Sequence, residues 1–594
     1  MRSIFSVVKK GILYLKANGL TETYAKVRHY LKYTRINSLT ENEAYKKWMQ
    51  NCEKIDAAQI QKEMAQFDYH PLFSVCIPVY NVEEKWLRKC IASVENQYYE
   101  HWQLCLADDC STDPQVRDIL KEYERKDSRI RVIYRKENGH ISRATNSALQ
   151  IAEGEFIVLM DNDDELSPDA LFEAAKLLQE NRDADVIYSD SDKLTESGER
   201  VDPYFKPDYC PDTLLSYNYI SHLGIYRKTL VDQVGGFRTG VEGSQDYDLL
   251  LRVTELTDRV YHIPKILYHW RIIEGSTASG VGQKNYAYLA GKKVLEDAVR
   301  RRGYHARVQL LEKILCYNVE FYPVGEHFCS IIIWFDGNVK KLNRCLKSIY
   351  KKTSGNNFEV IIVSNKKYSQ KEKQNLNRYK NVGTVICNSE LNYSELNNRA
   401  AKKAKGDLLL FIEDNIEILS KNWLQFMAGE AERKEIGVVG VKILDIKNKV
   451  YHAGIAMGLS GVAGYIGRGK DKDDNGYMSC LSVRRNYMAV CGKCFMVRKK
   501  IFMEIKGFDK LLNEKYQDID LCVRINGKGY QNIFLPDVLV KYTNHEKKDF
   551  MKSNVIKKDI YRMQMKWGEK IIFDPYYSQN FELNSSELKI KTHL

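Results

Sequence analysis

A short apolar run that ends in acids constrains this chain more than any other feature. Residues 156–160 read Phe-Ile-Val-Leu-Met, and Asp161, Asn162, Asp163 and Asp164 follow directly. A run of this length is too short to span a membrane and predicts a buried strand of a parallel sheet. Converging carboxylates repel one another and are costly to bury unpaired, so the cluster favours a bound cation. Ligands that are all oxygens favour a hard divalent ion, Mg²⁺ or Mn²⁺.

The same acids also suit a solvated turn before a helix. In that interpretation Ser167 is the N-cap and Pro168 the first helical residue. We expect this capping whether or not the acids bind a metal. Both interpretations therefore stay open from this stretch alone.

The length of the chain and its cysteines indicate how many domains to expect and in which redox compartment the protein folds. At 594 residues it should hold more than one domain, since a domain takes about 100–200 residues. Its fourteen cysteines stand singly, several within apolar runs, which is typical of small core residues in a reducing compartment. The one Cys-x-x-Cys motif, Cys491 to Cys494, has no second pair at zinc-finger spacing, so strand packing is favoured over a metal or redox role.

The first 70 residues predict a helical N-terminal segment. Within residues 1–40, apolar side chains recur at helical spacing among lysines and arginines. Such a segment suits peripheral contact with an anionic membrane surface, and it suits equally well packing on its own protein or a dimer contact. A second helical stretch covers residues 41–67, and a boundary follows at His70-Pro71.

The sequence shows neither a transmembrane segment nor a signal peptide, so we expect a cytoplasmic protein. No window of about 18 apolar residues exists, so we expect no transmembrane helix. Lys9 and Lys10 interrupt the apolar run at the N-terminus, which argues against a signal peptide.

From Phe73 onward, strands and helices alternate, which predicts a parallel sheet. The predicted strands cover residues 73–79, 102–107, 130–134 and 156–160, and the helices between them cover 84–97, 113–126 and 141–152. Ligands of open α/β sheets lie at the carboxyl ends of the strands. We therefore expect Tyr80, Asp109, Asp161 and Asp163 to converge at one edge.

Two further segments carry candidate site residues. After a predicted strand at residues 185–189, Asp246 stands just before a predicted helix at 249–254, where an acid also interacts well with the helix dipole. His269 and Arg271 lie close together further on, although a lone histidine is more often structural than a ligand.

These segments together resemble the family 2 glycosyltransferases, which have the GT-A fold. The motifs that carry the resemblance are Pro78-Val79-Tyr80-Asn81, Asp108-Asp109-Cys110-Ser111-Thr112-Asp113, residues 138–149, residues 154–169 and Gln245-Asp246. The resemblance covers residues 70–300, in the right order and spacing. It is closest to enzymes that build bacterial O-antigen, capsule or wall polysaccharides.

The resemblance implies a role for each matching residue. The donor, a nucleotide-diphosphate sugar, would be bound by Pro78, Val79, Tyr80, Asp108, Asp109, Arg143, Asn162 and Arg271. Asp161 and Asp163 match the D-x-D motif that holds Mn²⁺ or Mg²⁺, with His269 as a further ligand. Asp246 matches the catalytic base.

The implied chemistry agrees with this set of residues. A cation stabilises the leaving nucleoside diphosphate, and a carboxylate removes the proton of the acceptor hydroxyl. No covalent intermediate is needed, so we expect inversion in a single displacement.

The same organisation returns in the second half, after a charged helical stretch at residues 286–302. Residues 328–333 and 358–363 parallel the first two strands, and Gly406 begins a run that parallels the one at Gly154. This half also resembles a family 2 glycosyltransferase domain. The tail motif Asp574-Pro575-Tyr576-Tyr577 resembles the ends of similar tandem chains.

The second half departs from the family pattern at its site positions. Trp334-Phe335-Asp336-Gly337 replaces Pro-Val-Tyr-Asn, and Ser364-Asn365 replaces the paired acids. Glu413 and Asn415 take the D-x-D positions, where Asn is a weaker ligand for a hard cation, and His545 is placed like His269. Asp518 stands where the base would sit. This half is either a second transferase with a looser donor site or an acceptor-holding domain, and the persistence of Asp518 favours activity.

Other functions fit less well. A nucleotidyltransferase should have a Gly-rich basic loop after the first strand, and a dehydrogenase should have G-x-G-x-x-G; neither is present. The net charge of +13 comes without an aromatic-basic module, so we expect no nucleic-acid partner.

The sequence thus predicts an α/β chain of two tandem GT-A domains. Its expected parts are a helical segment at 1–70, a domain at 71–302, a linker at 303–324, a second domain at 325–550 and a tail at 551–594. The expected activity is transfer of a sugar to a lipid-linked bacterial surface glycan at the inner face of the cell membrane.

Overall fold

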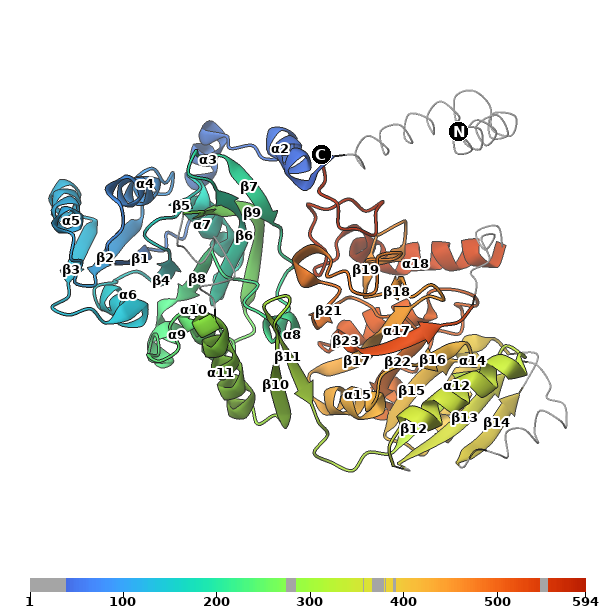
Figure 1. Cartoon of the computed structure of the whole chain (residues 1–594). Helices are drawn as coiled ribbons and strands as arrows, with labels where there is room; N and C mark the ends of the chain where they lie inside the picture. The colour runs from blue at the N-terminus through green and yellow to red at the C-terminus, as the bar shows by residue number, and fades with distance from the viewer. Residues whose placement is uncertain are drawn as a thin grey trace, which may run out of the picture.

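The computed structural model describes residues 39–273, 285–355, 357–365, 379, 381–387, 391–544 and 554–593. Two helix-covered sheets lie side by side, the first in blue to green and the second in yellow to red (Figure 1). We call them the first unit and the second unit. The predicted helix within residues 1–38 and the candidate ligand His545 lie outside the described residues.

The first sheet has the order β3-β2-β1-β4-β8-β6-β9-β5, with β7 paired to β6. Its strands are β1 (Phe73–Val79), β2 (Trp102–Asp108), β3 (Ile130–Tyr134), β4 (Phe156–Leu159), β5 (Glu165–Leu166), β6 (Val186–Leu194), β7 (Arg200–Tyr204), β8 (Gly224–Arg227) and β9 (Val260–Arg271). The pairs of β1 with β2 and β4 are parallel, and β8 runs antiparallel between β4 and β6. The predicted mostly parallel sheet is confirmed, and its central strands are buried except at Pro78.

The helices of the first unit begin where local capping allows. They are α4 (Glu84–Glu95), α5 (Pro114–Lys126), α6 (His140–Gln150), α7 (Ala170–Glu180), α8 (Pro211–Leu214), α9 (Lys228–Gln233) and α10 (Gln245–Val253). The expected start of α7 at Pro168 is wrong: Asp169 is the N-cap, and the Ser167 hydroxyl donates to its carboxylate over 2.5 Å instead of accepting from the helix. Helix α10 begins four residues earlier than predicted, so Asp246 lies in its first turn.

Two short helices precede the first sheet, where one stretch was expected. They are α2 (Glu41–Asn51) and α3 (Ala57–Met64), and Asp56 caps the second by accepting from two backbone N–H groups. Helix α2 packs through Trp48, whose ring centroid lies 5.0 Å from that of Phe205.

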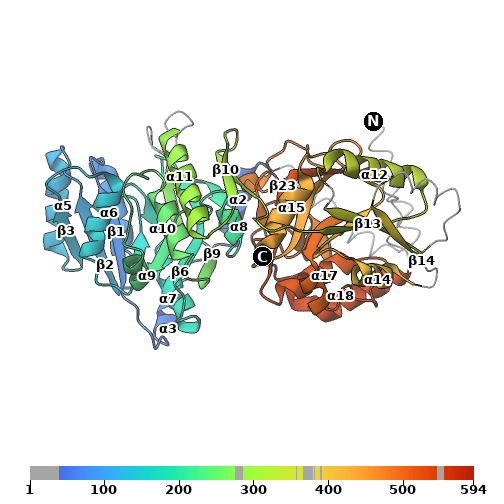
Figure 2. The ribbon, with the colours of Figure 1, turned by 90° about the horizontal axis from the view of Figure 1, so that it is seen from below.

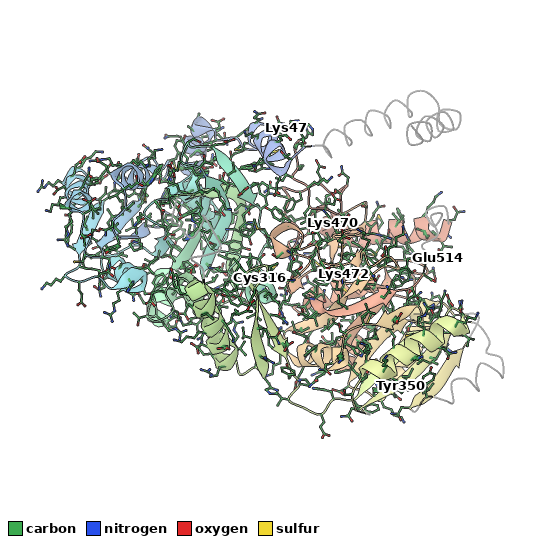
Figure 3. The ribbon with its side chains drawn as sticks, in the orientation of Figure 1. Lys47, Cys316, Tyr350, Lys470, Lys472 and Glu514 are labelled. Atoms are coloured by element: carbon green, nitrogen blue, oxygen red, sulfur yellow. The ribbon has the colours of Figure 1, made fainter. Side chains whose placement is uncertain are left out.

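The segment 303–324, predicted as a linker, contains a hairpin. Helix α11 (Asn285–Arg301) leads into an antiparallel hairpin of β10 (Ala306–Leu311) and β11 (Cys316–Phe321). The backbone N–H of Tyr317 donates to the carbonyl of Ser216 over 2.7 Å. Figure 3 labels Cys316, the first residue of β11, between the two units.

The second sheet repeats the order of the first: β14-β13-β12-β15-β22-β17-β23-β16, with β18 and β21 added at β17 and β23. Its strands are β12 (Cys329–Trp334), β13 (Phe358–Ser364), β14 (Val382–Cys387), β15 (Leu408–Glu413), β16 (Ile416–Ile418), β17 (Ile436–Leu444), β18 (Val450–His452), β21 (Arg485–Asn486), β22 (Cys494–Arg498) and β23 (Gln531–Tyr542); β19 (Ile455–Met457) and β20 (Ala463–Tyr465) form a separate pair.

Helices lie on both sides of the second sheet. They are α12 (Val339–Lys352), α14 (Tyr393–Lys403), α15 (Trp423–Glu432), α16 (Lys499–Glu504), α17 (Gln517–Asn526) and α18 (Asn554–Ile572). The view in Figure 2 shows α12 on one side of this sheet and α14 and α17 on the other. No helix among the described residues has the length and apolar character needed to cross a membrane.

A buried ion cluster joins the two units. Asp212 of the first unit is fully buried and accepts from Arg433 over 2.5 Å and from the Asn486 side chain over 3.1 Å. Arg433 also contacts Glu430 at 2.9 Å, and Arg484 contacts Glu430 at 2.6 Å. The hydrophobic core is likewise continuous across both units. The units therefore form one packed body.

The C-terminal tail contacts α2 and both units. The Asn580 side chain accepts from Trp48 Nε1 and donates to Asp190 of the first unit, each over 3.2 Å. The Asp574 carboxylate accepts from the backbone of Met457 in the second unit over 2.7 Å.

Candidate functional site

The acidic cluster lies at the carboxyl end of the central strand β4, as predicted. Asp164 is structural: it is fully buried and accepts from the backbone N–H of Arg271 over 2.7 Å and from the Tyr268 hydroxyl. Asp161 is different, because its side chain remains 38% exposed. The cluster thus divides into one acid that fixes the turn and two, Asp161 and Asp163, that remain for a ligand.

The electrostatics of Asp161 and Asp163 suit a hard cation. Burial raises the pKa of Asp161 to about 6, and burial together with the charge of Asp161 raises the pKa of Asp163 to about 6. A divalent ion would relieve that repulsion, and Mg²⁺ is often held by one or two carboxylates together with substrate phosphates and water. Among the described residues, no three His, Cys, Asp or Glu side chains are arranged to hold a metal. A metal at this site would therefore complete its shell with substrate and water oxygens.

An imidazole that the sequence analysis did not single out lies beside the cluster. His222 Nε2 is 3.5 Å from Asp161 Oδ2, and its ring stacks on Tyr268 with centroids 4.7 Å apart. Burial lowers the pKa of His222, while the charges of Asp246 and Asp163 act in the opposite direction. The antiparallel strand β8 brings His222 here, and only the strand register reveals that placement.

A buried lysine braces the His222 segment. Lys206 is fully buried, and its ammonium donates to the carbonyls of Ile220 and His222, each over 2.6 Å. Burial lowers the pKa of Lys206 to about 7. The backbone of this segment is therefore fixed by a side chain that sequence reasoning also missed.

Asp246 lies within electrostatic reach of the acidic cluster. Its Oδ2 accepts from the Asn218 side chain over 2.7 Å. Burial raises the pKa of Asp246, His222 lowers it, and the charge of Asp161 raises it further. The charges of the candidate base and of the candidate metal ligands thus act on one another around His222.

The candidate donor-binding acids are held by their own loops. Asp109 accepts from Arg135 Nε over 2.7 Å and from the backbone N–H of Gly139 over 2.9 Å. Asp108 accepts from Arg117 Nε over 2.8 Å and from the Ser111 backbone over 3.0 Å. Both acids therefore shape the loops at the ends of β2 and β3.

The remaining donor-side residues divide between exposed and buried positions. The Asn162 side chain donates to the carbonyl of Pro78 over 3.1 Å, which ties the end of β4 to β1 beside Val79. Tyr80 is 46% exposed, and the Arg143 side chain is 56% exposed with its guanidinium 4.0 Å from Glu137. These two side chains are open to a ligand.

His269 and Arg271 are both held by neighbouring polar groups. His269 Nδ1 lies 2.6 Å from Asp192 Oδ1, a contact that orients the ring through one nitrogen and does not involve Nε2. Arg271 is fully buried and donates to the carbonyl of Asp163 over 2.7 Å. Arg271 therefore supports the acidic turn from inside.

In the second unit a lysine contacts Glu413, the residue that takes the position of Asp161. Lys493 Nζ lies 2.9 and 3.0 Å from the two carboxylate oxygens of Glu413, and the Asn415 side chain donates to Glu413 over 3.1 Å. Asp518 accepts from the backbone N–H of Gly492 over 2.6 Å. Burial raises the pKa of Asp518, and the charge of Lys493 lowers it.

Sequence comparisons find relatives of this chain over most of its length. The chain is 36% identical over 552 residues to the uncharacterized protein y4gI of Sinorhizobium fredii, covering 90% of this chain and 60% of that protein. It is 32% identical over 562 residues to the O-antigen biosynthesis protein RfbC of Myxococcus xanthus, covering 92% and 43%. The putative teichuronic acid biosynthesis glycosyltransferase TuaG of Bacillus subtilis is 28% identical over 216 residues, covering 36% and 83%.

The chain spans 60% and 43% of the lengths of the first two of these relatives. Among solved structures, S. aureus TarS 1–349 in complex with UDP-GlcNAc is 25% identical, covering 38% of this chain and 65% of that one, with a TM-score of 0.32. The model of the family described as glycosyl transferase family 2 matches residues 74–235 and 330–506, one match in each unit and more than half of the chain. The chain therefore belongs to glycosyl transferase family 2.

Proposed function

We propose that the first unit is a metal-dependent inverting glycosyltransferase that moves a sugar from a nucleoside-diphosphate sugar to a bacterial surface glycan. The observation that carries the proposal is the shared environment of Asp246 and Asp161, in which each carboxylate lies near His222. The names of RfbC and TuaG support the polysaccharide context.

Asp246 is the proposed base for the acceptor hydroxyl. Its Oδ2 is held by Asn218, so the carboxylate has a fixed direction before substrate arrives. Because burial raises the pKa of Asp246, the carboxylate is a stronger base than an exposed aspartate, which favours proton transfer near neutral pH. The hydroxyl oxygen, once deprotonated by Asp246, attacks the anomeric carbon from the face opposite the diphosphate.

Asp161 and Asp163 would hold the divalent cation. When bound, Mn²⁺ or Mg²⁺ supplies Lewis-acid stabilisation of the leaving diphosphate. Tyr80 and Arg143 are the proposed contacts to the base and the diphosphate, and their exposure supports this role. The buried Arg271 keeps the acidic turn in shape from below.

Release of nucleoside diphosphate tests the proposal. The purified chain is incubated with a panel of sugar nucleotides and a glycan acceptor, with Mn²⁺ or with a chelator, and product anomers are assigned by NMR. We expect inverted product only with metal, and loss of turnover in Asp246→Asn but not in the exposed control Asp183→Asn. Turnover that survives both chelation and Asp246→Asn would refute the proposal.

The second unit has two candidate roles. Asp518 occupies a position in α17 like that of Asp246 in α10, which supports a second transferase. The pairing of Glu413 with Lys493 instead favours an acceptor-holding domain. An unchanged product pattern in Asp518→Asn would exclude a second catalytic site, and loss of one linkage would establish it.

A lipid-linked acceptor implies contact with the inner face of the cell membrane. Besides residues 1–40, helix α18 supports this proposal, because it exposes large apolar side chains among lysines: Tyr561, Met565, Ile572 and the following Phe573. Such a surface suits anionic lipid. Flotation with anionic liposomes tests it: full-length protein should bind, and Met565→Glu together with removal of residues 1–38 should abolish binding. Binding that the double change leaves intact would count against it.

A further inference from the structure

Lys493 and His222 occupy equivalent positions in the two units. The runs that begin at Gly154 and Gly406 align without a gap, so that Leu159 corresponds to Phe411. Leu159 pairs with Gly224 in the first sheet, and Phe411 pairs with Phe495 in the second. Counting back two residues from each strand partner reaches His222 in one unit and Lys493 in the other. The alignment also makes Glu413 and Asn415 the counterparts of Asp161 and Asp163.

The second unit places a cation of its own against this acidic position. Lys493 Nζ contacts both oxygens of Glu413, and it lies 4.5 Å from the ring centroid of Tyr542. The lysine side chain is only 17% exposed. In the first unit the equivalent His222 stands 3.5 Å from Asp161 and leaves that carboxylate 38% exposed.

The charge of this lysine is well supported by its neighbours. Its ammonium donates to both carboxylate oxygens of Glu413, so the positive charge is paired inside the site. Glu413 also accepts from Asn415, so its oxygens already have three donor contacts. A divalent ion here would have to displace the ammonium and then remain close to it, which like-charge repulsion opposes.

We propose that Lys493 takes the place of the metal in the second unit, so that this unit binds no divalent cation. Among the described residues, the metal site that remains is then that of the first unit, a statement that rests on the proposed function. Asn415 fits the same conclusion, because a site whose cation is a single ammonium needs one carboxylate rather than two.

Titration with Mn²⁺, followed by electron paramagnetic resonance of the full chain, tests the inference. We expect about one bound Mn²⁺ per chain, lost in Asp161→Asn with Asp163→Asn and unchanged in Glu413→Gln. Two bound ions, one of them lost in Glu413→Gln, would overturn the inference.

A gain of binding gives the sharper test. Lys493→His with Asn415→Asp gives the second unit a histidine and a second carboxylate, as in the first unit, and this variant should bind one Mn²⁺ more than the wild type. Lys493→Met with Asn415→Asp checks the same point without an imidazole, and circular dichroism establishes that each variant is folded. If folded forms of both variants bind no additional ion, Lys493 is not what excludes the metal.

These outcomes separate the inference from the proposed function. If the wild type binds no Mn²⁺ and the Lys493 variants gain a site, the metal site of the first unit fails while the inference about the second unit holds. If the wild type binds one ion at Asp161 and Asp163 and the variants gain nothing, the inference fails alone.

Discussion

Removing Arg433 should loosen the junction between the two units. Its guanidinium contacts Asp212 at 2.5 Å, Glu430 at 2.9 Å and Glu435 at 2.8 Å. Asp212 is fully buried and the Glu430 side chain is 2% exposed, so water cannot replace the lost partner. Burial acts to raise the pKa of Asp212, but Arg433 and Arg484 hold it below its usual range, so the carboxylate is charged in the folded protein.

The expected cost of Arg433→Met follows from this geometry. Removing one partner of a buried ion pair typically costs about 3–5 kcal/mol, because the other charge is left uncompensated. Here Arg484 still contacts Glu430 at 2.6 Å and Asn486 still donates to Asp212, so we expect the lower end, about 3 kcal/mol. Methionine keeps much of the packing of the arginine stem, so the loss is mainly electrostatic.

Urea unfolding followed by tryptophan fluorescence measures this cost. The matched control is Lys46→Ala, whose partner Glu199 is 48% exposed and whose loss should cost about 0–1 kcal/mol. Adding Asp212→Asn to Arg433→Met should restore part of the loss, since one unpaired buried charge disappears. If Arg433→Met unfolds at the same urea concentration as Lys46→Ala, the cluster does not stabilise the junction and the reasoning is refuted.

Three further outcomes are expected. Asp246→Asn should lower sugar transfer about 100- to 10,000-fold at an unchanged melting temperature, and near-normal turnover would remove Asp246 from the mechanism. The pKa values of Asp161 and Asp163 are raised to about 6, so protons compete with the metal below that pH. Calorimetry should show the Mn²⁺ affinity falling up to about tenfold per pH unit for each carboxylate. A Mn²⁺ affinity that stays constant between pH 7 and 5 would contradict the site. Gly154→Ala should destabilise the first sheet, since a Cβ there would stand 2.6 Å from the backbone oxygen of Leu72. A melting temperature equal to that of the wild type would show that the backbone shifts to accept the methyl group without loss of stability.

The sheet was largely predictable because its strands are local apolar runs. Residues 73–79 and 130–134 form strands with the predicted limits. The acidic cluster was predictable for the same reason: it follows one such run directly. The start of α7 was not, because Ser167 and Asp169 bond to each other and the competition between two capping residues depends on that geometry.

Residues contributed by antiparallel strands were the ones missed. His222 and Lys493 stand just before β8 and β22, short strands whose pairing to β4 and β15 is set by long-range packing. Nothing in the local pattern marks either residue. The placement of His269 depended on similar information, since its partner Asp192 lies on β6 and the pairing of β6 with β9 fixes that contact.

The contact between α2 and the C-terminal tail has a consequence for synthesis. Trp48 and Asn580 bond across 532 positions of the chain, so this contact cannot form until residue 580 has left the ribosome. The first sheet can assemble early from neighbouring strands, whereas α2 waits for its partner. A nascent chain stalled before Asn580 should therefore carry a folded first sheet and an α2 helix that proteases still reach.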